Sequence, residues 1–255
     1  MKIISWNVNS LRVRLKQVER VLREERPDVL ALQETKLQDP EFPAEVFDAL
    51  GYHAVFAGQK TYNGVALITR AEPVGLITEL PVMEDPARRV IAATFDGVRV
   101  IDLYVPNGKA VGSDKYEYKL EWLGHLHDWL RDELQKHAAV VVVGDFNIAP
   151  EDRDVHDPET WRDRILCSPP ERSAISGLLT LGLTDTFRIH EQAAGHHSWW
   201  DYRGSGLRRD EGLRIDLVLA SDALAGRCIE ARIHRDARTW DRPSDHAPVS
   251  ATFER

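Results

Sequence analysis

Cysteine is scarce in this chain of 255 residues, and its scarcity excludes several classes of protein. The only two cysteines, Cys167 and Cys228, are too few for a disulfide framework, and neither has a neighbour at CxxC spacing that would indicate a zinc site. Long apolar runs are also missing, and the first ten residues lack the apolar centre of a signal peptide. We therefore expect a reduced, intracellular protein without a membrane span.

Positive charge is in deficit as well. Asp and Glu number 41 against 33 Lys and Arg, which gives a formal net charge of −8. A passive nucleic-acid binder needs Lys and Arg to neutralise phosphates, so this balance argues against one. It does not exclude an enzyme that acts on DNA, because acidic groups hold divalent cations and a local basic rim can exist on an acidic protein.

Low-complexity tracts, repeats of fixed period and Pro/Ser-rich linkers are absent from the sequence. With 43% hydrophobic residues, the chain can build one large core. We predict a single domain over residues 1–255. A doubly wound nucleotide fold is disfavoured, because the first strand is followed by Asn7, Val8 and Asn9 and not by a glycine-rich turn.

Strand-like segments alternate with a few long helices. Segments rich in β-branched and aromatic residues cover 3–8, 29–33, 53–57, 64–69, 90–95, 98–105, 140–144, 199–202, 215–220, 229–233 and 249–253. Helical periodicity predicts helices over 11–22, capped by Ser10, and over 116–134, with a third over 171–181 that ends at Gly182. This composition predicts an α/β fold of four layers, an αββα sandwich with two mixed sheets packed face to face and helices outside.

Two motifs nearly a hundred residues apart suggest hydrolytic chemistry. The motif G-D-F-N at 144–147 follows a buried apolar run, and S-D-H at 244–246 precedes the last predicted strand. The first places a carboxylate and an amide at a strand end, and the second places an imidazole beside a carboxylate. We expect Asp216 to orient His246 through its second ring nitrogen.

Polar side chains recur at the ends of predicted strands. The members of this set are Asn7, Glu34, Asp145, Asn147, Asp216 and Asp245. Carboxylate and amide oxygens are the hard ligands that Mg²⁺ or Mn²⁺ prefers. Turn capping accounts for single Asp and Asn residues, but it does not explain Glu34 inside L-Q-E-T at 32–35.

An ordered series of motifs extends these observations to the whole chain. It comprises S-W-N-V-N-S at 5–10, L-Q-E-T-K at 32–36, Y-N-G-V-A at 62–66, Y-V-P-N-G at 104–108, G-D-F-N-I-A-P at 144–150, W-D-Y-R at 200–203, L-R-I-D at 213–216 and S-D-H-A-P at 244–248. From residue 2 to residue 253 the sequence closely resembles the exonuclease III family, which includes abasic-site endonucleases of base excision repair. That family lies within the endonuclease/exonuclease/phosphatase superfamily.

The resemblance implies a DNA repair nuclease that depends on Mg²⁺ or Mn²⁺. It implies hydrolysis of phosphodiester bonds in duplex DNA, 5′ to abasic sites or from 3′ ends, including 3′-phosphatase action. It further implies a monomer in the cytoplasm, associated with the nucleoid, that binds double-stranded DNA and no membrane.

The resemblance also assigns roles to single residues. The implied metal ligands are Asn7, Glu34, Asp145, Asn147 and Asp245. The implied catalytic residues are Tyr104, Asp145, Asn147, Asp216 and His246, with Asp145 positioning the attacking water, Asn147 stabilising the scissile phosphate and Tyr104 approaching the phosphate or the leaving group. Whether Asp145 or His246 is the general base stays open at this point.

Residues near these motifs are candidates for holding DNA. They are Asn9, Arg88, Asn107, Lys109, Trp199, Trp200 and Arg203. Three basic patches adjoin the motifs: Arg88 with Arg89, Lys109 with Lys115 and Lys119, and Arg203 with Arg208, Arg209 and Arg214. Side chains alternate along an extended segment, so one of the two tryptophans is expected in the core and the other at the substrate. We also expect Leu166 to point toward the site, where it would narrow an abasic pocket and favour 3′-terminal substrates.

Two other interpretations remain. One is a phosphomonoesterase or lipid phosphodiesterase of the same superfamily, against which the W-D-Y-R and L-R-I-D motifs argue. The other is a catalytically silent DNA-binding or scaffold protein, against which the complete acidic and amide set argues.

Overall fold

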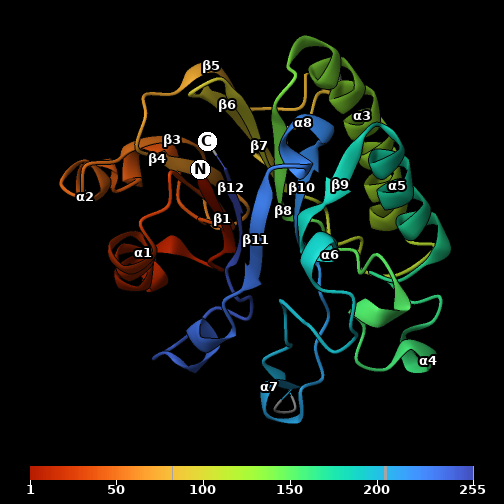
Figure 1. Cartoon of the computed structure of the whole chain (residues 1–255). Helices are drawn as coiled ribbons and strands as arrows, with labels where there is room; N and C mark the ends of the chain where they lie inside the picture. Colours follow the sequence, from red (N-terminus) through yellow and green to blue (C-terminus); the bar gives the residue numbers. More distant parts are fainter. Residues whose placement is uncertain (82, 204–205, 255) are drawn as a thin grey trace.

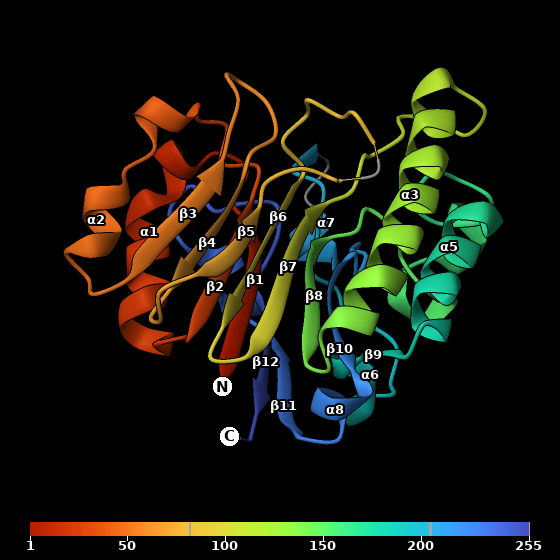
Figure 2. The same ribbon diagram turned by 90° about the horizontal axis from the view of Figure 1, so that it is seen from above.

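The computed structural model describes residues 1–81, 83–203 and 206–254. Two six-stranded sheets stack face to face, and helices cover both outer faces (Figures 1 and 2). The four-layer αββα sandwich predicted from the sequence is confirmed.

The first sheet has the strand order β11-β12-β1-β2-β4-β3. Its strands are β1 (Lys2–Asn7), β2 (Val29–Gln33), β3 (His53–Ala57), β4 (Val65–Thr69), β11 (Cys228–Ile233) and β12 (Val249–Phe253). β1 and β2 run parallel, and the other neighbours pair antiparallel.

The second sheet has the order β5-β6-β7-β8-β10-β9. Its strands are β5 (Val74–Ile77), β6 (Val90–Phe95), β7 (Val98–Tyr104), β8 (Val140–Asp145), β9 (Leu183–Asp185) and β10 (Asp216–Ser221). Here β7 and β8 form the parallel pair. The short strands β5 and β9 lie at the two edges, and sequence analysis missed both.

Helices separate onto the two outer faces. The α-helices are α1 (Leu11–Glu25), α2 (Ala44–Asp48), α3 (Asp114–Lys136), α4 (Pro158–Trp161), α5 (Pro169–Thr180), α6 (Thr186–His190), α7 (Gly206–Arg209) and α8 (Asp222–Ala225), and the 3₁₀ segments are η1 (Asp39–Glu41), η2 (Asp152–Asp154) and η4 (Arg235–Thr239). Helices α1 and α2 cover the first sheet, and α3 and α5 cover the second (Figure 2). In the described part of the chain, no helix is both long and apolar enough to cross a membrane.

The predicted helices need two adjustments. Ser10 does precede α1, but its side chain makes no capping hydrogen bond and its φ is 95°. α5 begins at Pro169, before the predicted start, because Ser168 and Glu171 form a capping box in which each side chain accepts a backbone N–H of the other.

The alternation of side chains along the strands separates three apolar cores, one between the two sheets and one between each sheet and its helices. In β2, Val29 and Ala31 pack between the sheets, whereas Leu30 and Leu32 face the helices α1 and α2. The same alternation runs along β7 and β8, so odd and even positions face opposite sides. Strands β2, β7 and β8 are therefore covered on both faces, and the polar side chains of the candidate site lie where the strands end.

Candidate active site

Four polar residues occupy inward positions at one end of the stacked sheets. Asn7, Tyr104 and Asp145 are the last residues of β1, β7 and β8, and Asp216 is the first residue of β10. In the antiparallel pairing of β8 with β10, Asp145 and Asp216 lie directly opposite each other. Because inward positions recur every second residue, each side chain continues the row that forms the core between the sheets.

Tight backbone turns after two strands orient the side chains of Glu34 and Asn147. Glu34, after β2, and Asn147, after β8, both have left-handed backbones, with φ of 52° and 49°. Gly144 has φ of 140°, and a Cβ there would lie 1.9 Å from the carbonyl oxygen of Leu103. Glycine is thus required for β8 to pass this close to β7.

The amide of Asn7 joins two carboxylates. Its Nδ2 donates to Glu34 Oε1 and to Asp145 Oδ2, both at 2.9 Å. The ligand atoms of Glu34, Asp145 and His246 lie within 4.8 Å of one another, and the site carries the hard oxygen donors that suit Mg²⁺ or Mn²⁺. The nearby cation is Lys36, whose Nζ lies 2.9 Å from Glu34 Oε2. These residues form a candidate acidic metal site.

The imidazole of His246 lies between two carboxylates. Its Nδ1 is 2.9 Å from Asp216 Oδ2, and its Nε2 is 3.7 Å from Asp145 Oδ2. Ser198 Oγ donates to Asp216 Oδ2 at 2.6 Å and accepts the backbone N–H of Ile215 and of Asp216 at 3.0 Å. This network fixes the orientation of the Asp216 carboxylate, and so the ring orientation of His246.

Burial and charge shift the pKa values of this group. Burial raises the pKa of Asp145 to about 7, although the positive charge of His246 opposes the rise. Burial acts to lower the pKa of His246, but the carboxylates of Asp216 and Asp145 outweigh it and raise that pKa to about 10. His246 is therefore a cation at neutral pH, and Asp145 stands near its midpoint, where it can accept a proton.

Asn147, Asn107 and Tyr104 border this centre. Asn147 Nδ2 donates to Asp145 Oδ2 at 3.2 Å, and Asn107 Nδ2 donates to Asn147 Oδ1 at 3.0 Å. Burial, followed by the negative charges of Glu34 and Asp145, raises the pKa of Tyr104 well above its ordinary value, so its hydroxyl stays protonated. The guanidinium of Arg89 lies 4.8 Å from the centre of the Tyr104 ring.

Asp245 is held beside the centre by neutral donors. Asn9 Nδ2 donates to its Oδ1 at 2.9 Å, and Trp199 Nε1 donates to its Oδ2 at 3.1 Å. Both oxygens are thus engaged, and the positive charge of His246 helps these bonds keep the pKa of Asp245 low in spite of burial. The structure gathers Asn7, Glu34 and Asp145 more tightly than it gathers Asp245.

The DNA candidates divide into accessible and buried residues. Asn107, Lys109 and Arg203 are exposed, and Asn9, Arg88 and Trp199 are half-buried. Trp200 is fully buried, its Nε1 donating to Asp210 Oδ1 at 3.0 Å, so its prediction as a DNA contact is corrected. Trp199 is the accessible tryptophan of the two and stays a candidate DNA contact. The two tryptophans lie in an irregular segment that makes only single bridges, so the strand predicted at 199–202 is wrong.

Two charges of the predicted basic patches are structural. Lys119 is fully buried, with its Nζ 2.5 Å from Glu171 Oε1. Arg214 is also buried, with Nε 2.7 Å from Asp154 Oδ1 and Nη2 2.7 Å from Asp185 Oδ2. Neither reaches solvent, which removes both from the candidate DNA surface.

Leu166 lies in a small apolar cluster next to the site. It is 4% exposed and packs with Val155, Leu213 and Ile215, while Trp199 packs against the same cluster. Its backbone is left-handed, with φ of 72°. Ile215 immediately precedes Asp216, so Leu166 occupies apolar space at the edge of the carboxylate and imidazole group.

Sequence reasoning missed the residues that orient this group. Ser198 and Lys36 contact site carboxylates, but a serine before two tryptophans and a lysine after a threonine carry no distinctive local pattern. Only the W-D-Y-R motif nearby and the L-Q-E-T-K motif itself pointed to these segments.

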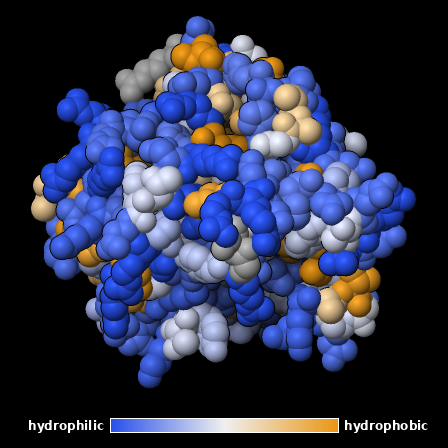
Figure 3. All heavy atoms as spheres, turned by 90° about the horizontal axis from the view of Figure 1, so that it is seen from below, coloured by the Kyte–Doolittle hydropathy of each residue, from blue (hydrophilic) through white to orange (hydrophobic). Residues whose placement is uncertain are grey.

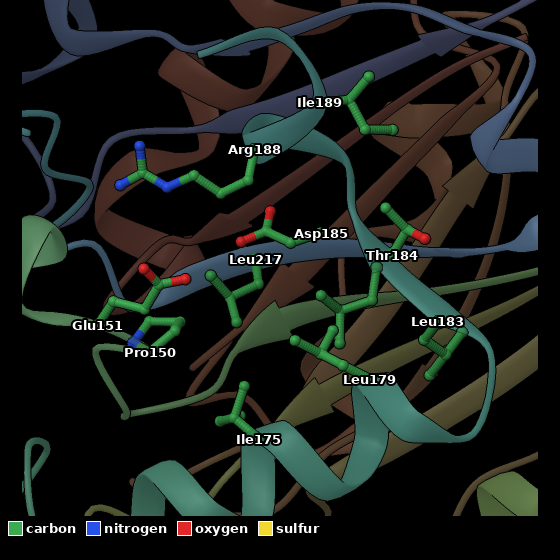
Figure 4. Close-up of a pocket in the computed structure, with 11 residues that line it drawn as sticks. Pro150, Glu151, Ile175, Leu179, Leu183, Thr184, Asp185, Arg188, Ile189 and Leu217 are labelled. Carbon is green, nitrogen blue, oxygen red and sulfur yellow. The ribbon is translucent and has the colours of Figure 1, made fainter. Parts of the chain in front are cut away.

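A separate cavity lies away from these residues. It has a volume of about 260 Å³, and its walls come from α5, β9, α6 and β10, with Leu179, Asp185, Arg188 and Leu217 among them (Figure 4). None of the residues that line it belongs to the carboxylate and imidazole group.

The end of the molecule that carries α4 and α7 is predominantly hydrophilic on its surface (Figures 1 and 3).

Fold and site together define a four-layer αββα sandwich with a carboxylate, amide and imidazole centre at the ends of its strands. The chain belongs to the endonuclease/exonuclease/phosphatase family, whose sequence pattern matches residues 4–246. It is 39% identical, over all of both chains, to exodeoxyribonuclease III of Haemophilus influenzae. Among solved structures, it is similar to a 3′ phosphatase from Neisseria bound to a product DNA hairpin, with 49% identity, full coverage of both chains and a TM-score of 0.98. An AP endonuclease from Archaeoglobus fulgidus is 37% identical with full coverage and a TM-score of 0.94.

Proposed function

We propose that this protein is a divalent-metal-dependent DNA repair nuclease that hydrolyses phosphodiester bonds in duplex DNA, 5′ to abasic sites and from 3′ ends. The observation that carries the proposal is one centre in which hydrogen bonds join Glu34, Asn7 and Asp145, a hydrogen bond joins His246 and Asp216, and an ion pair of 3.7 Å links Asp145 to His246. Such a centre supplies oxygen ligands, a proton acceptor near neutral pKa and a fixed cation, which together suit phosphate hydrolysis.

Glu34 and Asn7 are the residues that we propose hold Mg²⁺ or Mn²⁺, with Asp145, Asn147 and Asp245 proposed as further ligands. When bound, the cation would offset the negative charge of the scissile phosphate. These residues suit such a cation because they offer carboxylate oxygens. Glu34 Oε1 accepts from Asn7 and Glu34 Oε2 lies beside Lys36, while Asp145 accepts from the same Asn7 amide. Hard oxygen donors of this type favour these two metals.

Asp145 and His246 share the handling of protons. We propose that ionised Asp145 positions and deprotonates the attacking water, because its pKa of about 7 leaves it a proton acceptor under ordinary conditions. His246, kept protonated and oriented by Asp216, faces a phosphate oxygen as a hydrogen-bond donor. This assignment makes Asp145 the general base, in preference to His246.

Asn147 and Tyr104 complete the site. Asn107 fixes the side chain of Asn147 by donating to its Oδ1, and Asn147 is proposed to donate to the phosphate as charge develops. Tyr104 keeps its proton and is proposed to contact the phosphate or the leaving oxygen. Both act as neutral donors beside a charged centre.

The accessible polar residues around the centre would hold the duplex. Lys109 and Arg203 are exposed cations, and Arg88 is half-buried. Asn9, Asn107 and Trp199 each contact a site residue and also reach the surface. We propose that the cations contact phosphates and that Trp199 packs on an exposed sugar or base.

Packing around Leu166 favours 3′ ends as the preferred substrate. An abasic nucleotide that swings out of the duplex needs an apolar space beside the scissile phosphate. Leu166 fills the apolar cluster formed with Leu213 and Ile215, next to Trp199. A terminal nucleotide does not need this space, and the similar Neisseria protein is a 3′ phosphatase.

The case against a phosphomonoesterase or lipid phosphodiesterase has lost one of its arguments. Burial of Trp200 and Arg214 means that their motifs do not speak for DNA. The curated and structural relatives nonetheless act on DNA by their names, which favours the nuclease. The complete centre argues against a silent scaffold.

The decisive experiment compares two labelled duplexes, one with a single internal abasic site and one with a recessed 3′ end, each with Mg²⁺ and with EDTA. Metal-dependent incision or 3′ shortening supports the proposal. Inactivity on both duplexes, together with turnover of a phosphomonoester or a lipid headgroup, would overturn it. Retained DNA affinity without any metal-dependent turnover would instead identify a scaffold.

We further propose a single domain over residues 1–255 that acts as a monomer, in the cytoplasm and associated with the nucleoid. The proposed location follows from the proposed DNA substrate. Sedimentation of the purified protein at several concentrations tests the monomer, and a second, heavier species would contradict it.

A further inference from the structure

One polar layer interrupts the apolar core between the two sheets. Ser5 in β1, Gln33 in β2 and Asp102 in β7 are all completely buried. Gln33 Nε2 donates to Asp102 Oδ1 at 2.6 Å and to Ser5 Oγ at 3.0 Å. The contact between Gln33 and Asp102 therefore crosses from the first sheet to the second.

Two atoms of this layer have no hydrogen-bond partner among the described residues. They are Gln33 Oε1 and Asp102 Oδ2, each the second oxygen of its group. Leaving two buried oxygens unsatisfied is costly, and an ionised carboxylate in this position would add the larger cost of a buried charge. Both costs disappear if a proton lies between the two oxygens.

The surroundings of Asp102 do not stabilise a negative charge. Its neighbours in the sheet are Ile91 on β6 and Val143 on β8, both apolar, and it accepts a hydrogen bond from Gln33, which carries no charge. Burial raises the pKa of Asp102 well above its ordinary value, against the opposing hydrogen bonds from Gln33 and from the backbone of Leu103. Among the described residues, no cation contributes to this balance.

We propose that Asp102 is a neutral carboxylic acid that donates from Oδ2 to Gln33 Oε1 while accepting from Gln33 Nε2, so that an acid–amide pair with two hydrogen bonds clamps the sheets together beneath the active site. The role assigned to this clamp is to position Glu34 and Tyr104, and in that respect the inference rests on the proposed function. Asp102 and Gln33 are positioning residues, since neither reaches the surface.

The location of the pair explains its effect on the site. Glu34 directly follows Gln33, so no spacer residue lies between them. The backbone of Glu34 is left-handed. Tyr104 follows Asp102 by two residues and so lies on the same face of β7, one step nearer the strand end. Paired hydrogen bonds fix the separation of β2 and β7 by direction and length, which apolar side chains do less strictly.

Infrared difference spectroscopy tests the protonation state directly. The spectrum of the protein minus that of Asp102→Asn, at neutral pH, should contain the carbonyl band of a protonated carboxylic acid. A difference spectrum that contains only carboxylate bands would overturn the proposal. This measurement needs neither metal nor DNA, and so its outcome does not depend on the proposed function.

Metal titration of variants tests the positioning role. Asp102→Asn retains one donor and one acceptor facing Gln33, so we expect its Mg²⁺ dependence of thermal unfolding to match that of the parent protein. Asp102→Val removes both hydrogen bonds at similar volume, and we expect about tenfold weaker Mg²⁺ binding, as for other groups that support a ligand from behind. An Asp102→Val titration that coincides with the parent titration would overturn the role.

A matched control separates positioning from general destabilisation. Val100 lies two residues before Asp102, on the same face of β7 and farther from the site, in the same core. Val100→Ala should lower the unfolding temperature without shifting the Mg²⁺ midpoint. If the infrared band and the shifted midpoint are found in a protein that is inactive on every DNA substrate, the nuclease proposal fails while the clamp stands.

Discussion

The two oxygens of Asp216 lie 2.9 and 3.1 Å from Nδ1 of His246. Nδ1 therefore carries a proton in either charge state of the ring, and Nε2 is turned toward Asp145. Asp216 thus determines which nitrogen of His246 faces Asp145.

Asp216→Asn should lower kcat by about 10²–10⁴-fold, the range that one positioned proton-transfer group contributes. The amide removes the negative charge that keeps His246 protonated and offers a donor where the imidazole also donates. Single-turnover rates on a duplex with a recessed 3′ end, at saturating Mg²⁺, measure the effect.

A buried aspartate on the next strand provides the control for this substitution. Asp185 in β9 accepts from Arg214 at 2.7 Å and contacts none of the proposed catalytic residues. Asp185→Asn should lower the unfolding temperature and leave kcat of the folded enzyme unchanged. Equal losses of kcat in the two variants would argue that Asp216 acts only through stability.

Metal binding should strengthen as pH rises from 6 to 8. Asp145 has a raised pKa of about 7, so below that value a proton competes with the cation at its carboxylate. Without metal, this raised pKa favours folding when the pH is low, and that contribution is lost as pH rises through about 7. His246, with its pKa raised from 6.5 to about 10, loses its own contribution as pH rises from about 6.5 through about 10.

Thermal unfolding with Mg²⁺ or EDTA at several pH values measures this linkage. The increase in unfolding temperature on adding Mg²⁺ should be larger at pH 8 than at pH 6. In Asp145→Asn the pH dependence of that increase should largely vanish, because the competing proton is gone. A larger increase at pH 6 than at pH 8 in the parent protein would contradict the proposed participation of Asp145.

The sequence predicts the centre well because each of its residues carries a local signal. Asn7 and Asp145 are the last residues of buried strands and Glu34 directly follows one, and alternation along a strand predicts the face on which each side chain lies. Two distant motifs then meet because β8 pairs with β10, and Asp145 lies opposite Asp216. Fold class, most strands and the candidate site followed from this regularity.

The burial of charged and aromatic side chains could not be predicted from the sequence, because it depends on partners that are remote along the chain. Lys119 looks like a surface lysine on a helix until Glu171, fifty-two residues later, is placed beside it. Arg214 is neutralised by Asp154, sixty residues earlier, and Trp200 is enclosed by the segment around Asp210. Charge and aromatic content are visible in a sequence, but burial of a charge requires the tertiary partner.

Lys109→Ala should weaken binding to duplex DNA and reduce its salt dependence. Lys109 is exposed, and its backbone N–H donates to Asn107 Oδ1, which places it beside the catalytic group. Loss of one phosphate contact makes the slope of log affinity against log salt shallower by about 0.9. Fluorescence anisotropy with a labelled duplex in EDTA, between low and moderate salt, measures the slope without turnover.

Lys136 supplies the matched control for Lys109. It is an exposed lysine at the last position of α3, a helix whose first residues follow the Lys109 turn, so it lies at the opposite end of that helix. Lys136→Ala should leave the salt slope unchanged. If both variants shift the slope equally, the effect is one of net charge and not of a phosphate contact.

Leu166→Gly should raise incision at abasic sites relative to processing of 3′ ends by about tenfold, the effect expected when an apolar pocket gains a side chain's volume. Glycine tolerates the φ of 72°, so relief of backbone strain partly offsets the stability lost from the apolar cluster. The two labelled duplexes, assayed at equal enzyme concentration, give the ratio.

Leu178→Ala is the control for Leu166→Gly, because Leu178 is equally buried but lies in the core between α5 and the second sheet. It should lower stability without changing the ratio. Unchanged abasic incision in Leu166→Gly would show that Leu166 does not limit entry of a flipped nucleotide, and the proposed preference for 3′ ends would then need another cause.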